Sequence, residues 1–164
     1  MLEANAVGKV GIEARRAYLA GLIDGDGCIM ATIERHGGKK FGFRVRVEMK
    51  LTLKERKLLD TFVREFNIGH VSGNRRNTEF TTHDWVIRDK NHLILLLEFI
   101  KPYSRLKRKQ IVLALKILRI TVCMPADLLR SARLADTLSS FNVRSKNRRK
   151  NFATMIKIPT SSND

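Results

Sequence analysis

Hydrophobic residues recur at every second position in one part of the chain. Residues 43–53 alternate strictly between apolar and polar side chains, which is the pattern of a strand with one buried face. A shorter alternation covers residues 28–34, and a glycine-containing segment at 36–39 separates the two. The pattern therefore predicts two antiparallel strands joined by a short turn.

Helical periodicity surrounds this hairpin. Apolar residues recur at intervals of three or four over 12–24, 54–66, 89–100, 107–122 and 126–140, and a second strand pair is expected at 70–73 and 79–88. Asp89 is placed to cap the third helix, which Pro102 would end. These elements predict an α+β fold, with an α-ββ-α-ββ-α core and additional C-terminal helices. We expect one domain, with its core at 12–122 and a C-terminal extension at 123–164.

The charge of the chain is strongly positive. Its 164 residues contain 32 Lys and Arg against 16 Asp and Glu, a formal net charge of +16, while 43% of the residues are hydrophobic. That hydrophobic share is enough for a folded core, and the surplus charge favours a nucleic-acid partner, because neutralising phosphates releases counterions. A merely solvated basic surface and an anionic membrane surface are the alternatives.

Several classes of protein are excluded. No apolar run approaches the ~20 residues of a membrane span, and the first ten residues lack the apolar region of a secretory signal. Cys28 and Cys123 stand far apart without any CxxC motif, so neither a disulfide scaffold nor a zinc knuckle is indicated. We expect an intracellular, reducing location, in a prokaryotic cytoplasm or an organelle.

Two carboxylates lie at the end of the first predicted helix, in Asp24-Gly25-Asp26-Gly27. The helix dipole already places negative charge there, so the two acids repel each other unless a cation joins them. Oxygen ligands favour Mg²⁺ or Ca²⁺ over zinc. An EF-hand is excluded, because its later ligand positions fall on Cys28 and Arg35. The alternative is that Asp24 caps or pairs while the glycines form a turn.

The wider string around these acids adds a resemblance. Residues 19–27 read Leu-Ala-Gly-Leu-Ile-Asp-Gly-Asp-Gly, which closely resembles the signature of the LAGLIDADG homing endonucleases, with Gly25 in place of Ala. Residues 102–110 are similar to the segment P-(F/Y)-L-x-x-K-x-K-Q of the members that carry one signature. Together with residues 58–60 and 66–69, the resemblance covers about 12–122.

The resemblance implies a specific assembly and active site. One signature per chain implies a homodimer, because two signature helices must pack together. The interface residues would be Ala17, Ala20, Gly21 and Asp24. Asp26 would be the catalytic metal ligand, the Gly25 carbonyl a further ligand, and Lys107 the active-site lysine. The implied cofactor is Mg²⁺, with Ca²⁺ or Mn²⁺ able to occupy the same sites.

The resemblance also implies a DNA-binding platform, in which two β-ribbons per subunit lie in the major groove. The cations expected to contact DNA lie on the strands, at hairpin tips, beside Lys107 and in a basic run near the C-terminus: Lys39, Lys40, Arg44, Arg46, Lys50, Arg75, Arg76, Arg88, Lys109, Arg144, Lys146, Arg148, Arg149 and Lys150.

The implied function is site-specific hydrolysis of both strands of a long, pseudo-palindromic DNA target by metal-activated water. One departure concerns the end of the second strand, where the family often has a polar residue, and a basic one four positions on. Leu51 and Glu55 occupy these positions, unless a bulge brings Lys50, Thr52 or Lys54 into place. The alternative functions are an RNA-binding intron-splicing maturase and a non-catalytic DNA-binding regulator on the same fold.

Overall fold

The computed structural model describes residues 11–74, 82–142 and 156. Its elements are α1 (Ile12–Asp26), β1 (Gly27–Arg35), β2 (Phe43–Leu53), α2 (Arg56–Phe66), β3 (His70–Asn74), β4 (Thr82–Ile87), α3 (Lys90–Ile100), α4 (Arg108–Arg119) and α5 (Pro125–Asn142). This order confirms the expected α+β architecture. The predicted DNA contacts at 75–76 and 144–150 lie outside the described residues, and no helix among those described is long and apolar enough to span a membrane.

The four strands form one antiparallel sheet in the order β1-β2-β4-β3. β2 pairs with β1 along the whole hairpin, from Arg35↔Phe43 to Gly27↔Leu51. β4 pairs only with the last part of β2, from Met49↔Ile87 to Leu53↔His83. The registers are continuous, so the described part of β2 contains no bulge.

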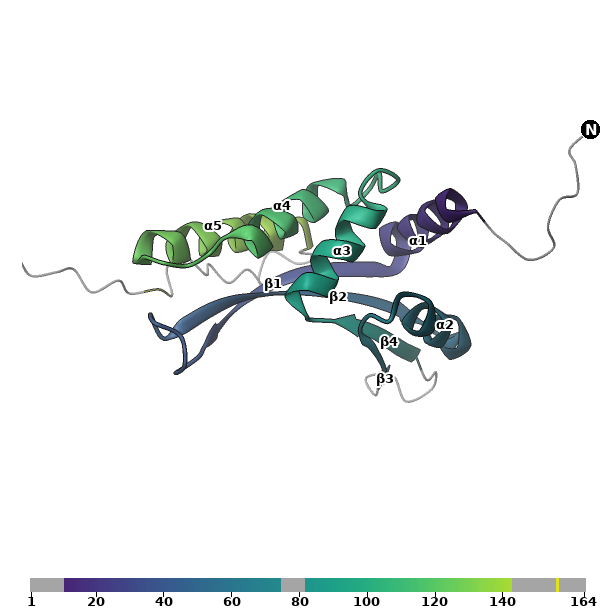
Figure 1. The fold of residues 1–164 in the computed structure, drawn as a ribbon, viewed down its shortest axis with the longest axis horizontal. Coiled ribbons are helices and arrows are strands. Elements are labelled where there is room, and N and C mark those ends of the chain that lie inside the picture. Colours follow the sequence, from purple (N-terminus) through teal and green to yellow (C-terminus); the bar gives the residue numbers. More distant parts are fainter. Residues whose placement is uncertain (1–10, 75–81, 143–155, 157–164) are drawn as a thin grey trace, which may run out of the picture.

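The alternation of β2 decides which face of the sheet is covered. Val47, Met49 and Leu51 are buried, and α1, α3, α4 and α5 lie on that side of the sheet (Figure 1). The polar residues of β2 point to the opposite face, which we call the open face. Burial of the apolar row therefore fixes the orientation of every polar residue between, because a shift by one residue would exchange the two faces.

Trp85 anchors the far end of the sheet. Its side chain is completely buried, its indole Nε1 donates to the Ile68 carbonyl at 2.8 Å, and its ring lies 5.5 Å from that of Phe62 on α2. The hydrogen bond satisfies the one polar atom of an otherwise apolar side chain. Trp85 is thus a core residue.

The first helix extends further than the pattern suggested. α1 continues through Gly25 to Asp26, and the Gly27 N–H closes its last turn on the Ile23 carbonyl. One helical glycine costs only about 1 kcal/mol, so Gly25 does not prevent this extension by two residues. A β-carbon on Gly27 would lie 2.6 Å from the Ile23 oxygen, so the helix passes directly into β1 only because residue 27 is glycine.

We predict that Gly69→Ala lowers the free energy of unfolding by at least about 2 kcal/mol. Gly69 has a φ of +71°, and a β-carbon there would lie 2.5 Å from the Val86 carbonyl oxygen. Chemical denaturation checks this, with Gly73→Ala as the control, because a β-carbon at Gly73 meets nothing within 4 Å. Equal stability of the two variants would contradict the close packing of this turn.

Candidate active site

The end of α1 is fastened to the segment that leads into α4 by one carboxylate. Asp24 accepts hydrogen bonds from Ser104 Oγ at 2.5 Å and from the backbone N–H groups of Arg105, Leu106 and Lys107 at 2.7, 3.1 and 3.0 Å. These donors lie at the N-terminal end of α4, where a negative charge is favourable. The contacts join segments about eighty positions apart and hold the two helix ends together.

The same contacts lower the pKa of Asp24. Partial burial alone would raise the pKa of this carboxyl, but the hydrogen bonds from Ser104 and the three backbone N–H groups outweigh burial and hold it below its ordinary value. Each of these bonds favours the ionised form. Asp24 is therefore a charged anchor, with its acceptor capacity used within the chain.

The environment of Asp26 differs from that of the hydrogen-bonded Asp24. Its side chain is exposed at the last position of α1, and among the described residues it makes no hydrogen bond or ion pair. Lys107 lies beside it in the same pocket, with its ammonium donating to the Asp24 backbone carbonyl. The pocket therefore contains a carboxylate without a partner among the described residues and a cation held by a backbone carbonyl.

The pocket at this site has a volume of 610 Å³ and is lined by residues from α1, the sheet, α4 and the end of α5: Asp24, Gly25, Asp26, Gly27, Cys28, Thr52, Leu106, Lys107, Gln110, Phe141 and Asn142. Asn142 Nδ2 donates to the Ile29 carbonyl at 2.5 Å, so the end of α5 is tied to β1 beside the acids. No three His, Cys, Asp or Glu side chains converge within the described ranges.

Comparisons with known proteins agree with this geometry. The family model for LAGLIDADG endonucleases matches residues 19–116. The chain belongs to this family. It is 32% identical over 103 residues to the DNA endonuclease I-CreI of Chlamydomonas reinhardtii, a match that spans 62% of this chain and only 60% of that protein.

Solved structures of the family share the fold. The homing endonuclease I-CvuI, in complex with the I-CreI target, is 26% identical with a TM-score of 0.75, over 88% of this chain and 91% of that one. The archaeal intron-encoded endonuclease I-Vdi141I, complexed with DNA, is 18% identical with a TM-score of 0.77, over 89% and 96%. The LAGLIDADG fold thus extends beyond the segment that the family model matches.

The strand positions that depart from the family pattern have different environments. Leu51 is fully buried on the covered face, and Glu55 precedes the first turn of α2. Thr52 faces the open side, lines the pocket and donates to Asp84 Oδ1 at 2.7 Å. Because β2 has no bulge in the described pairing, Thr52 is the polar group that this strand brings to the site.

The expected interface residues fall on two sides of α1. Ala17 and Gly21 are exposed on one face together with Tyr18 and Gly25. The prediction for Ala20 was wrong, because its side chain is 0% exposed within this chain. Ala20 lies on the side of the helix that also buries Leu19 and Ile23, so it has no surface to offer a partner.

Sequence reasoning missed Ser104 and Asn142 at the site, and it gave Gln110 no role there. Ser104 had a visible signal, because it stands where the family segment has Leu, and its hydroxyl now bonds Asp24. Gln110 is the last residue of the family segment, whereas the place of Asn142 at the site follows only from tertiary packing.

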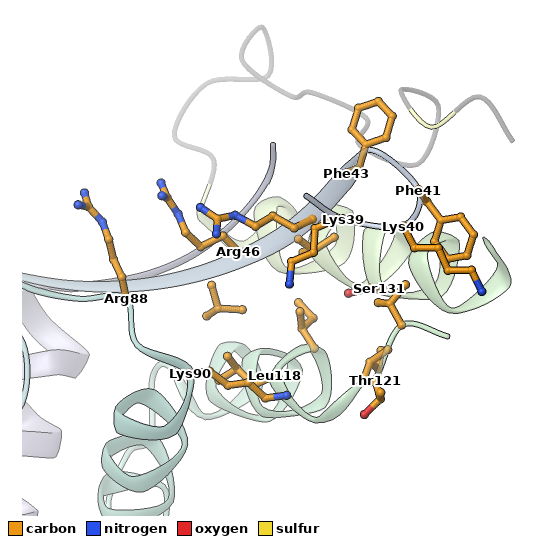
Figure 2. Close-up of a pocket in the computed structure, with 16 residues that line it drawn as sticks. Lys39, Lys40, Phe41, Phe43, Arg46, Arg88, Lys90, Leu118, Thr121 and Ser131 are labelled. Carbon is orange, nitrogen blue, oxygen red and sulfur yellow. The ribbon is translucent and has the colours of Figure 1, made fainter. Parts of the chain in front are cut away.

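The predicted DNA contacts within the described residues are all exposed or half-buried. Lys39 and Lys40 lie in the β1–β2 turn, Lys109 is exposed on α4, and Arg88 follows β4. Arg46 and Arg88 extend away from α4, on the opposite side of β2 from Leu118 (Figure 2). The open face thus presents arginine side chains from two neighbouring strands.

We predict that Asp24→Asn lowers the free energy of unfolding at pH 7 by about 1–3 kcal/mol, because four donors lose a charged acceptor at a partly solvated site. Asp26→Asn, the control, should change it by less than about 0.5 kcal/mol. Denaturant titrations measure both.

The difference between wild type and Asp24→Asn should also depend on pH. Because the pKa of Asp24 is lowered in the folded chain, its contribution is complete above the ordinary value of 3.8 and is lost as the pH falls through the lowered pKa. Equal destabilisation by both variants at pH 7 would contradict the distinct environments of the two acids.

Proposed function

We propose that this chain is a site-specific DNA endonuclease that works as a homodimer, with Asp26 of each copy at the reacting phosphate. The observation that carries the proposal is the contrast between two neighbouring acids. Asp24 is saturated by hydrogen bonds, whereas Asp26 is exposed and has no partner within the described part of the chain. A carboxylate with no partner among the described residues is available to bind a ligand. Lys107 lines the same pocket.

The available donors suit a hard divalent cation such as Mg²⁺. They are the Asp26 carboxylate and the Gly25 carbonyl, because the last carbonyls of a helix lack intrahelical partners. When bound, the cation supplies a more acidic water and neutralises charge on the phosphate. The second copy and the DNA would contribute the remaining oxygen ligands. The I-CvuI complexes with DNA were obtained in the presence of Mg or Ca, which supports this choice.

Lys107 would stabilise the charge that builds on the phosphate during hydrolysis. Its ammonium is held by the Asp24 carbonyl, and its backbone N–H is held by the Asp24 carboxylate. A cation fixed before the reaction needs no reorganisation when negative charge develops. Asp24 therefore acts on catalysis indirectly, by positioning Lys107.

The exposed face of α1 favours assembly through this helix. A β-carbon on Gly21 or Gly25 would meet nothing within 4 Å in this chain, so packing within the chain does not require glycine there. Each helical glycine costs roughly 0.5–1 kcal/mol relative to alanine. Close approach of a second α1 gives a reason for both glycines, and it would bring the two Asp26 side chains near one DNA site.

Double-stranded DNA is the proposed substrate. The related I-CvuI and I-Vdi141I are complexed with DNA, and this chain carries a net charge of +16. The two-fold symmetry of a homodimer would require a target with matching pseudo-palindromic symmetry.

We predict that wild type cleaves one pseudo-palindromic family of sequences from a randomised duplex library in Mg²⁺, whereas Asp26→Asn binds the same family without cutting. Bound DNA is selected in Ca²⁺, the ion is exchanged for Mg²⁺, and the cut ends are sequenced. Enrichment without cutting by wild type would identify a DNA-binding regulator, and enrichment of structured RNA instead would identify a maturase. Full activity of Asp26→Asn would refute the assignment of Asp26.

We predict that Gly21→Gln raises the dissociation constant of the dimer at least tenfold, because a long side chain separates the two helices. Its own chain should not lose stability, since glutamine is a better helix former than glycine. Sedimentation equilibrium measures the association, with the exposed α3 residue changed as Leu95→Gln as the control. An unchanged dimer in Gly21→Gln would place the interface elsewhere.

A further inference from the structure

The open face of the sheet carries a cluster of paired charges, which we call the open-face cluster. Its members are Glu34, Arg44, Arg46, Glu48, Lys50, Asp84 and Arg88. Glu34 pairs with Arg44 at 2.9 Å and with Arg46 at 2.7 Å. Within this cluster the four cations face three acids, so its net charge is small although the whole chain is strongly basic.

Glu48 lies at the centre of the cluster and is 8% exposed. Its Oε2 accepts from Arg88 Nε across two neighbouring strands, and its Oε1 lies 3.5 Å from Lys50 Nζ. Burial alone would raise the pKa of Glu48, but Arg88 and Lys50 outweigh it and hold the pKa below its ordinary value. Glu48 is therefore a charged, largely buried acceptor that pairs with the exposed Arg88 and the half-buried Lys50.

The contact with Glu48 leaves the Nη end of the Arg88 guanidinium available to a ligand. Its Nε is engaged by Glu48, whereas its Nη atoms have no partner within the described ranges, and its side chain is 48% exposed. Figure 2 shows the guanidinium at the tip of a side chain that points away from the helices. The two Nη groups, the donors that can hydrogen-bond guanine O6 and N7, therefore face outward.

We propose that Glu48 is a specificity-determining positioning residue, which fixes Arg88 in the orientation that reads guanine. The inference rests on the proposed DNA-binding function. A free arginine side chain has several rotamers, and one held before binding loses less conformational entropy on contact with a base. A mobile Arg88 could instead turn to the nearest phosphate, which would add affinity without any preference for sequence.

The small net charge of the open-face cluster supports a role in reading bases over a role in binding phosphates. Affinity that comes from neutralising phosphates needs unpaired cations, and here Arg44, Arg46, Lys50 and Arg88 already have acidic partners. Acids on a DNA-binding face weaken the attraction of that face for every duplex. The same acids hold the cations in a fixed geometry.

The test compares the base preferences of variants in the full-length protein. Wild type, Glu48→Gln, Arg88→Ala and the double variant are each used to select from a randomised duplex library in Ca²⁺, and binding is measured against salt concentration. We expect Glu48→Gln and Arg88→Ala to lose guanine preference at the same target position, at least about fivefold. The double variant should lose no more than Arg88→Ala alone.

Two further variants separate positioning from simple charge. Arg88→Lys keeps the charge but lacks the planar fork, so it should lose the same guanine preference. Glu65→Gln on the exposed side of α2 removes an acid away from the open face, and it should tighten binding slightly and uniformly without changing the preferences.

Three outcomes overturn the inference. If Glu48→Gln tightens binding to all duplexes and keeps the wild-type preferences, Glu48 only repels DNA. If it unfolds the protein while Arg88→Lys keeps the guanine preference, the pair is structural only. If wild type itself enriches no sequence family, the proposed function fails, and this inference fails with it.

Discussion

The bond between Asp24 and the 104–107 segment is the constraint on which the site depends. A carboxylate at the C-terminal end of a helix is unfavourable by itself, and here it is stabilised by four donors at the start of another helix. The same contact sets the position of Lys107, through both its N–H and its ammonium group. Asp26, two residues later, has no partner among the described residues. A pair of acids that look equivalent in sequence thus has two different environments.

The open face follows a similar principle, in which charges are held before a ligand arrives. Glu34 and Glu48 each contact two cations of the sheet, so its arginines are ordered side chains and not a diffuse basic patch. The net charge of +16 must therefore come largely from other parts of the chain. Under the proposed function, attraction to nucleic acid and selection among sequences would then depend on different residues.

Much of the fold could be predicted because local patterns agreed with the tertiary structure. Strict alternation in β2, the cap at Asp89 and the apolar periodicity of the helices correspond to observed elements. The proximity of Asp26 and Lys107 could be expected only through the family motifs, since no local pattern relates residues that distant.

The remaining features depend on packing. Ala20 looks like a residue for close helix contact, yet the rotation of α1 buries it. Thr52 and Asn142 reach the site only because a sheet edge and the end of α5 meet there. The pairing of Glu48 with Arg88 joins two strands whose register the sequence pattern does not specify.

The central claim is that each copy supplies one reactive Asp26 to a shared cleavage centre. A heterodimer with one wild-type chain and one Asp26→Asn chain, purified through two different affinity tags, tests this claim on the selected target. The account predicts at most a nick in one strand, while the tagged wild-type homodimer makes a double-strand break. A double-strand break by the heterodimer at the wild-type rate would contradict it.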